Sequence, residues 1–129
     1  MTKIERFEDL NCWKTARELC KLIYMFTRKE KFSKDFALVR QIRDSSGSSM
    51  DNIAEGFERG GNKEFIQFLS VSNGSIAEVK SQLYRALDQD YINEKEFQEA
   101  SVLADKTGKE TTNLILYLKK SSMKGYKFR

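Results

Sequence analysis

The sequence contains no histidine, no proline and only two cysteines in 129 residues. Without histidine, the chain lacks the commonest general base, the commonest metal ligand and the side chain that normally titrates near neutral pH. Cys12 and Cys20 stand eight residues apart with no second pair, so the spacing of a zinc site is missing, and we interpret both as reduced thiols on one helix. We therefore predict no catalytic residue, no metal site, no cofactor and no enzymatic activity. A di-iron bundle is disfavoured in particular, because its ligands include Glu-x-x-His motifs.

Long apolar runs are also missing. No stretch reaches the roughly 18 apolar residues that a membrane-spanning helix needs, and the first six residues include an acid and no apolar segment of a signal peptide. With 40% hydrophobic and 33% charged residues, the composition is that of a globular domain. We expect a single cytoplasmic domain that does not bind a membrane.

The absence of proline leaves long helices uninterrupted, since a proline inside a helix costs about 3 kcal/mol. Apolar and small residues recur at alternating steps of three and four, which is the spacing of one helix face, and no segment shows the alternation of a strand. Four helices with short connections pack antiparallel to their sequence neighbours, so the sequence predicts an all-α, up-down four-helix bundle. The helices are expected at about residues 9–28, 35–59, 62–89 and 93–118, with a charged, exposed loop at 29–34.

Local signals mark the helix ends. Asp35 is a suitable N-cap for the second helix, and the two glycines at 60–61 are a helix stop. Asn62 is expected to cap the third helix. Asn93 and Glu96 have the spacing of a capping box at the start of the fourth.

The net charge of +4 is unevenly distributed. Residues 119–129 carry five cations and no acid, so residues 1–118 together carry a net charge of −1. We divide the chain into a bundle at 1–118 and a basic tail at 119–129. Cations and aromatic rings together are a modest signature of RNA binding, whereas the alternative is a solvated terminus that aids solubility. The candidate nucleic-acid-binding residues are Lys119, Lys120, Lys124, Tyr126, Lys127, Phe128 and Arg129. The next candidates, on the first helix, are Lys14, Arg17, Lys21 and Arg28.

Polar residues at helical spacing form a second candidate site on the second and third helices. In one interpretation they are a structural network that fixes the register of the two helices. In the other, Glu55 and Glu78 are a carboxylate pair of a hydrolase or ligand site; we favour the structural interpretation because no nucleophile accompanies them. The predicted network consists of Arg43, Asn52, Glu55, Arg59, Ser75 and Glu78.

Two further features exceed what a minimal bundle needs. The third helix carries a second set of apolar residues, which is either an oligomer interface or a wide core-facing stripe: Ile66, Phe68, Val71, Tyr84 and Leu87. Residues 45–49 are four serines and a glycine, whose small side chains allow close helix packing or leave room for a ligand.

Several strings of residues resemble the signature of one bacterial family, the proteins encoded within intervening sequences of large-subunit ribosomal RNA genes. The strings are Gln41-Ile42-Arg43, Asn52-Ile53-Ala54-Glu55-Gly56-Phe57-Glu58-Arg59 and Lys63-Glu64-Phe65-Ile66-Gln67-Phe68-Leu69. The resemblance implies an up-down four-helix bundle, a homopentamer and a role related to RNA. The accessory protein of diversity-generating retroelements, which associates with a reverse transcriptase and nucleic acid, is distantly similar. The chain departs from the family pattern at Asp44, where a second cation is common, at Met50, where proline is common, and at Ser46, Gly47 and Ser49.

Two hypotheses from different classes follow. The first is a non-enzymatic, homo-oligomeric bundle that acts as an RNA-associated scaffold. The alternative is a protein-binding adaptor that recruits a nucleic-acid enzyme such as a reverse transcriptase.

Overall fold

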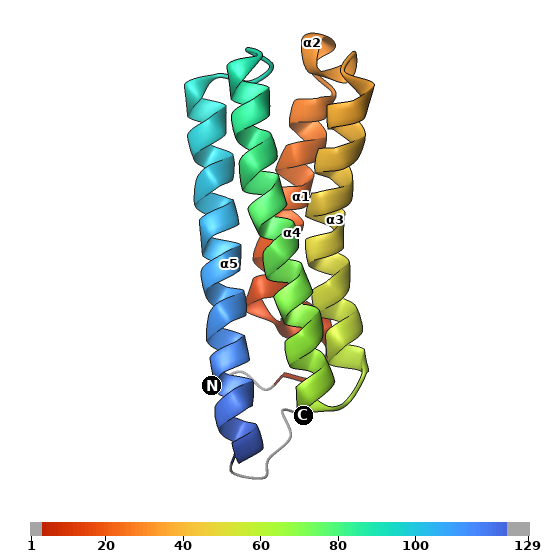
Figure 1. Cartoon of the computed structure of the whole chain (residues 1–129), viewed down its shortest axis with the longest axis vertical. Coiled ribbons are helices and arrows are strands. Elements are labelled where there is room, and N and C mark those ends of the chain that lie inside the picture. Colours follow the sequence, from red (N-terminus) through yellow and green to blue (C-terminus); the bar gives the residue numbers. More distant parts are fainter. Residues whose placement is uncertain (1–3, 124–129) are drawn as a thin grey trace.

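The computed structural model describes residues 4–123, which form an all-helical bundle without strands in that range. A single 3-10 turn precedes four long helices, and a short helix connects the first two of them (Figure 1). The elements are η1 (Phe7–Asp9), α1 (Asn11–Thr27), α2 (Glu30–Ser33), α3 (Phe36–Glu58), α4 (Asn62–Asp88) and α5 (Glu94–Met123).

The four long helices run up, down, up and down along the bundle axis, so α1 begins and α5 ends at the same end of the molecule (Figure 1). Around the bundle, α1 packs against α3 and α5, and α4 packs against the same two helices on the other side. This arrangement confirms the predicted antiparallel four-helix bundle. No helix among residues 4–123 has an apolar stretch of the length and purity that crossing a bilayer requires.

Most of the predicted helix ends are confirmed by their hydrogen bonds. The Asp35 side chain accepts from the Leu38 amide at 3.1 Å at the start of α3. At the start of α5, the amide of Asn93 donates to Glu96 at 2.9 Å, and the amide of Glu96 donates to the Asn93 side chain at 2.8 Å, which is a capping box. The predicted cap at Asn62 is wrong: Gly61 occupies the cap position and Asn62 is already helical.

The predicted loop at 29–34 is exposed at most of its positions, as expected, but it is not an irregular loop. It contains α2, which lies at the upper end of the bundle in Figure 1, and the Phe32 side chain of this helix is fully buried. Phe32 stacks on the ring of Tyr91 at a centroid distance of 5.0 Å, and the Tyr91 hydroxyl donates to the Asp35 carboxylate at 2.9 Å. A single apolar residue in a charged segment gives no periodic signal, so only the tertiary structure reveals that Phe32 is part of the core.

The boundary between bundle and tail lies further along the chain than residue 118. Helix α5 continues to Met123, because no helix breaker intervenes and Ser121 remains buried on the inner face. Lys119 and Lys120 are therefore helical residues, and cations are favourable near a helix C-terminus.

The core consists of two apolar clusters, one toward each end of the bundle. They draw on all four long helices, and along each helix the buried residues recur at steps of three and four, as the predicted helix faces require. The upper cluster in Figure 1 includes Leu19, Ile23, Phe26, Phe32, Leu38, Ile42, Val79, Leu83 and Phe97. The lower cluster includes Leu10, Cys12, Ala16, Ile53, Phe57, Phe65, Leu69 and Leu118.

Between the two clusters lies a layer of buried hydroxyl groups: Thr15, Ser46, Ser49, Ser72, Thr107 and Thr111. Buried hydroxyls destabilise a fold unless they are hydrogen-bonded, and these are. The Ser49 and Ser72 hydroxyls are 3.0 Å apart, and the Ser72 hydroxyl also lies 3.0 Å from the Ser49 carbonyl oxygen. The serine run of α3 thus serves close helix packing at Ser46 and Ser49, which is the first of the two interpretations given above.

Gly56 marks the closest approach of α3 to α4. A Cβ atom at this position would lie 2.7 Å from the Cβ of Phe68 and 2.9 Å from a ring carbon of Phe65. The Cβ of Phe68 is fixed to the α4 backbone, so it cannot move without moving the helix.

We expect Gly56→Ala to destabilise the protein by about 1–3 kcal/mol through overpacking, although alanine is the better helix former. Gly47→Ala is the matched control, because nothing lies within 4 Å of a Cβ at Gly47. It should stabilise the helix by about 0.5–1 kcal/mol. Urea denaturation at one protein concentration measures both; equal effects of the two changes would contradict the close approach.

Truncation of either core cluster should be costly. Ile53 and Leu83 have no exposed surface, so Ile53→Ala and Leu83→Ala should each reduce the free energy of unfolding by about 2–5 kcal/mol. Val102, 63% exposed on α5, provides the control. Its replacement by alanine should change stability by about 0.5 kcal/mol or less. A loss that small at either core position would show that the helix faces are wrongly assigned.

Candidate functional site

The predicted polar network on α3 and α4 is divided into separate interactions. Arg43 turns toward α1 rather than α4: its guanidinium carbon lies 4.4 Å from the ring centroid of Tyr24, and its Nε donates to the Thr27 hydroxyl at 2.9 Å. The Thr27 hydroxyl lies 3.0 Å from the Ile23 carbonyl oxygen, which it can bond in turn. Arg43 therefore joins α3 to α1 and positions the Tyr24 ring.

Asn52 and Ser75 do come together, through Ser48 of the serine run at residues 45–49. The Asn52 amide nitrogen donates to the Ser48 hydroxyl at 2.9 Å and to the Ser48 carbonyl at 2.8 Å. The Ser75 hydroxyl of α4 donates to the same Ser48 hydroxyl at 3.0 Å. These bonds link α3 to α4 beside the Ser49–Ser72 pair, which agrees with a structural role.

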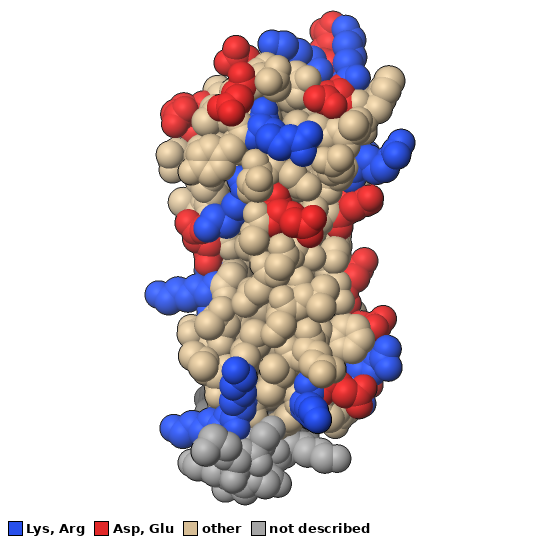
Figure 2. Space-filling view, viewed as in Figure 1, with Lys and Arg blue, Asp and Glu red and all other residues tan. Residues whose placement is uncertain are grey.

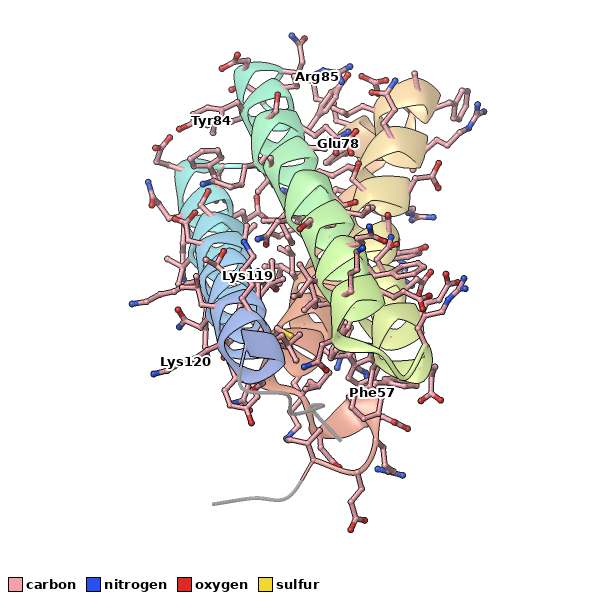
Figure 3. The ribbon with its side chains drawn as sticks, turned by 60° about the horizontal axis from the view of Figure 1, so that its bottom comes forward. Phe57, Glu78, Tyr84, Arg85, Lys119 and Lys120 are labelled. Carbon is pink, nitrogen blue, oxygen red and sulfur yellow. The ribbon has the colours of Figure 1, made fainter. Side chains whose placement is uncertain are left out.

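The charged members of the network lie on the surface. Arg59 and Glu55 form an exposed ion pair at 3.2 Å within α3, and Arg59 also lies 5.0 Å from the ring of Phe68. Glu78 is exposed on the side of α4 that carries Arg85 (Figure 3). The cross-helix bond at this level comes instead from Arg85, which donates to the Gln41 side chain at 2.8 Å.

The predicted basic tail lies mostly outside the described residues. Lys119 and Lys120 are exposed on the last turns of α5 (Figure 3). The remaining candidates lie beyond residue 123: Lys124, Tyr126, Lys127, Phe128 and Arg129. Within the described part of the chain, the cations of α1 form a more extensive surface.

A cavity of about 400 Å³ lies beside α1, where α1 meets α3. Apolar and sulfur-containing side chains form part of its wall: Cys20, Tyr24 and Met25 of α1, and Met50 of α3. Three cations complete the wall, Arg17 and Lys21 of α1 and Arg28 at its C-cap, and no acidic side chain belongs to it. Met25 lies off the core-facing stripe of α1 and Tyr24 lies at its edge, so helical spacing alone does not mark either residue as part of a surface cavity.

Two further hollows adjoin this cavity along α1. One shares Arg17 and Lys21 with it and is also lined by Trp13 and Lys14. The other shares Tyr24 and is lined by Arg43, Gly47, Ser48 and Asn52, with Asp44 and Asp51. We call the three hollows together the α1 groove. Its cations include the four secondary candidates of the sequence, together with Arg6 and Arg43: Lys14, Arg17, Lys21 and Arg28.

The opposite side of the bundle carries an uncharged surface. Residues 65–77 of α4 and 111–118 of α5 contain no charged side chain, and a hydrogen bond of 3.1 Å from Asn73 to Thr112 places the two stretches side by side. Figure 2 shows the resulting area without charges over the lower half of the bundle. We call residues 65–77 and 111–118 the α4–α5 surface.

The second apolar set of α4 is divided between the core and the exposed surface. Ile66 and Leu87 pack against the core clusters, as a wide core-facing stripe would. Val71 is 53% exposed on the α4–α5 surface, and Tyr84 is 59% exposed beside Phe97, at a centroid distance of 4.8 Å. The core-facing interpretation therefore holds for Ile66 and Leu87, whereas Val71 and Tyr84 are exposed on the surface.

Comparison with known proteins identifies the family. Residues 8–113 match the family described as 23S rRNA-intervening sequence protein. The chain belongs to this family. The match extends from η1 to the last third of α5 and includes the α1 groove and most of the α4–α5 surface.

A solved structure of this kind comes from Bacteroides thetaiotaomicron and is described as a protein of unknown function from the S23 ribosomal protein family. It superimposes with a TM-score of 0.74, covers 81% of this chain and 97% of its own, and is 21% identical. At that identity the likeness establishes a common fold. No functionally curated protein matches the chain.

In this intervening-sequence family member, the two thiols differ in environment. Burial raises the pKa of the Cys12 thiol from 9.0 to about 11, and Cys12 is only 3% exposed. Cys20 is half-buried in the wall of the α1 groove, where the Ser46 hydroxyl lies 3.6 Å from its sulfur. Among the described residues, no group of three or more histidine, cysteine, aspartate or glutamate side chains is arranged to hold a metal ion.

We expect only Cys20 to react rapidly with a thiol reagent in the native protein. The thiolate is the nucleophile, and at about pH 8 Cys12 is protonated and shielded. Native labelling should therefore modify one thiol per chain, and labelling after denaturation should modify two. Cys20→Ser should abolish the rapid phase, whereas Cys12→Ser should keep it; rapid labelling of Cys12 in Cys20→Ser would contradict its burial.

Proposed function

We propose that this protein is a non-catalytic scaffold that assembles with itself into a homopentamer and associates with RNA. The α4–α5 surface is the observation that carries the proposal. Two long helical stretches without charge lie side by side, and each presents an exposed apolar side chain, Val71 at 53% and Leu116 at 58%. Protein interfaces are depleted of charge at their centres, whereas the surface of a monomer normally carries it.

A self-association surface on α4 and α5 agrees with the rest of the bundle. The same uncharged stretches also contribute three buried residues to the lower core cluster, Phe65, Leu69 and Leu118. The surface is therefore anchored in the core. A rigid surface loses little conformational entropy when a partner covers it. The number of subunits rests on the resemblance to pentameric relatives.

Membership of the intervening-sequence protein family and the cations of α1 and of the α5 terminus support the association with RNA. Cations release condensed counterions from phosphates, which favours binding to any nucleic acid. The alternative is an adaptor that binds a nucleic-acid enzyme through the same α4–α5 surface. The two proposals differ in whether the pure protein self-associates and binds RNA unaided.

We expect light scattering at micromolar concentration to give about 75 kDa, five times the chain mass of 15.0 kDa. The variant Val71→Glu/Leu116→Glu should dissociate to a monomer, because charges in the covered surface lose their hydration. Val102→Glu is the control: Val102 is equally exposed on α5 but lies outside the uncharged stretches, so its variant should remain assembled. Far-UV circular dichroism should show equal helix content in all three proteins.

A stable 15.0 kDa native monomer would contradict self-association and favour the adaptor. An unchanged mass for the double variant would move the interface away from the α4–α5 surface.

A further inference from the structure

The α1 groove combines a cationic rim with an aromatic wall. Arg17, Lys21 and Arg28 stand four and seven residues apart on one face of α1, so they extend over about 16 Å of helix. Within residues 4–123 none of the three forms an ion pair with a carboxylate, and the cavity that they line contains no acid. Three unneutralised cations around one cavity favour a ligand with several negative charges.

Tyr24 is the aromatic side chain at the centre of the groove. It lines both the 400 Å³ cavity and the hollow beside Arg43, and it is 36% exposed although the core of α1 lies one residue away at Ile23. Arg43 lies 4.4 Å from its ring centroid and is itself held by Thr27. The Tyr24–Arg43 pair is thus a fixed pair of planar groups at the surface, and unpaired bases stack on such groups.

The groove continues from the cavity toward Trp13. Arg17 lies 5.7 Å from the Trp13 ring centroid, and the ring also packs edge-on against Phe7 at 5.1 Å. Glu8 and Glu18 line this hollow with the cations, and Glu8 is paired with Arg6 at 3.9 Å. Positive charge is therefore most concentrated at the central cavity, where aromatic and apolar side chains are also exposed.

We propose that the α1 groove binds single-stranded RNA, with phosphates at Arg17, Lys21 and Arg28 and a base on Tyr24. This inference rests on the RNA association proposed above and names its site and its ligand. A duplex hides its bases from an aromatic wall, whereas a single strand offers phosphates and base faces together. The groove lies along α1 and α3, opposite the α4–α5 surface, so self-association leaves it open.

The first test compares two variants that remove the same charge. Arg17→Gln/Lys21→Gln changes the groove, and Lys106→Gln/Lys109→Gln changes two exposed cations of α5. The ligand is a fluorescent oligouridine of about a dozen nucleotides, a length within the usual range of single-strand sites. Each phosphate contact contributes about −0.7 to the slope of log affinity against log salt. The groove variant should lose about 1.4 in slope and about tenfold or more in affinity, and the control should change by roughly twofold or less.

The second test uses the aromatic side chains. Tyr24→Leu should weaken binding by about five- to 100-fold because a stacked base loses its platform, whereas Tyr24→Phe should keep most of the affinity. Trp13, the single tryptophan of the sequence, lines the groove and reports occupation directly. Its fluorescence should change as RNA binds to the native protein, and a strand held elsewhere would leave it unchanged.

The outcomes separate the two proposals. If the native chain does not bind the oligouridine at low salt, the association with RNA itself is contradicted. If it binds but both double variants weaken equally, or the Trp13 signal stays constant, the groove is overturned and the association stands. Loss of binding only on deletion of residues 124–129 would likewise overturn the groove and assign the contact to the tail.

Discussion

The close contact of α3 with α4 is the constraint on which the rest of the bundle depends. Gly56 allows α4 to approach until the Phe68 Cβ stands where a side chain of residue 56 would begin, and the paired hydroxyls of Ser49 and Ser72 hold the next two turns. Larger residues at this contact between α3 and α4 would separate the two helices and leave the hydroxyls of Ser49 and Ser72 unpaired. Because an unpaired buried hydroxyl costs about 1–3 kcal/mol, the pairing also fixes the register of the two helices.

The hydroxyl layer divides the core into two apolar clusters, but it leaves no buried hydroxyl of the layer without a hydrogen bond. Apolar clusters above and below it bury the large side chains, and each hydroxyl finds a carbonyl or a second hydroxyl as its partner. A polar layer of this kind disfavours slipped registers, since a slip would place hydroxyls against leucine and phenylalanine side chains. Ser48 lies at the edge of the same contact between α3 and α4. Asn52 of α3 and Ser75 of α4 therefore both donate hydrogen bonds to the Ser48 hydroxyl.

The order of helices around the bundle separates the two candidate surfaces. Both α1 and α4 pack against α3 and α5, so α1 and α4 occupy opposite corners. The cationic α1 groove and the uncharged α4–α5 surface consequently face different directions, and one partner does not obstruct the other. Arg43 of α3 adds to the positive charge on the α1 side, because its guanidinium lies over Tyr24 of α1 and not beside an acid of α4.

The sequence by itself determined the number of long helices, the helix faces and most of the caps. These follow from spacing within one helix, as the fully buried positions of Leu69, Val79 and Leu83 and the Asn93–Glu96 box show. Only the tertiary structure decided which polar residues meet, because a helix face does not specify its neighbour. It separated Arg43 from Asn52 and Ser75, left Glu78 exposed, buried Phe32 and placed Tyr24 among cations. Contacts between distant segments depend on the packing of whole helices, and no local pattern encodes that packing.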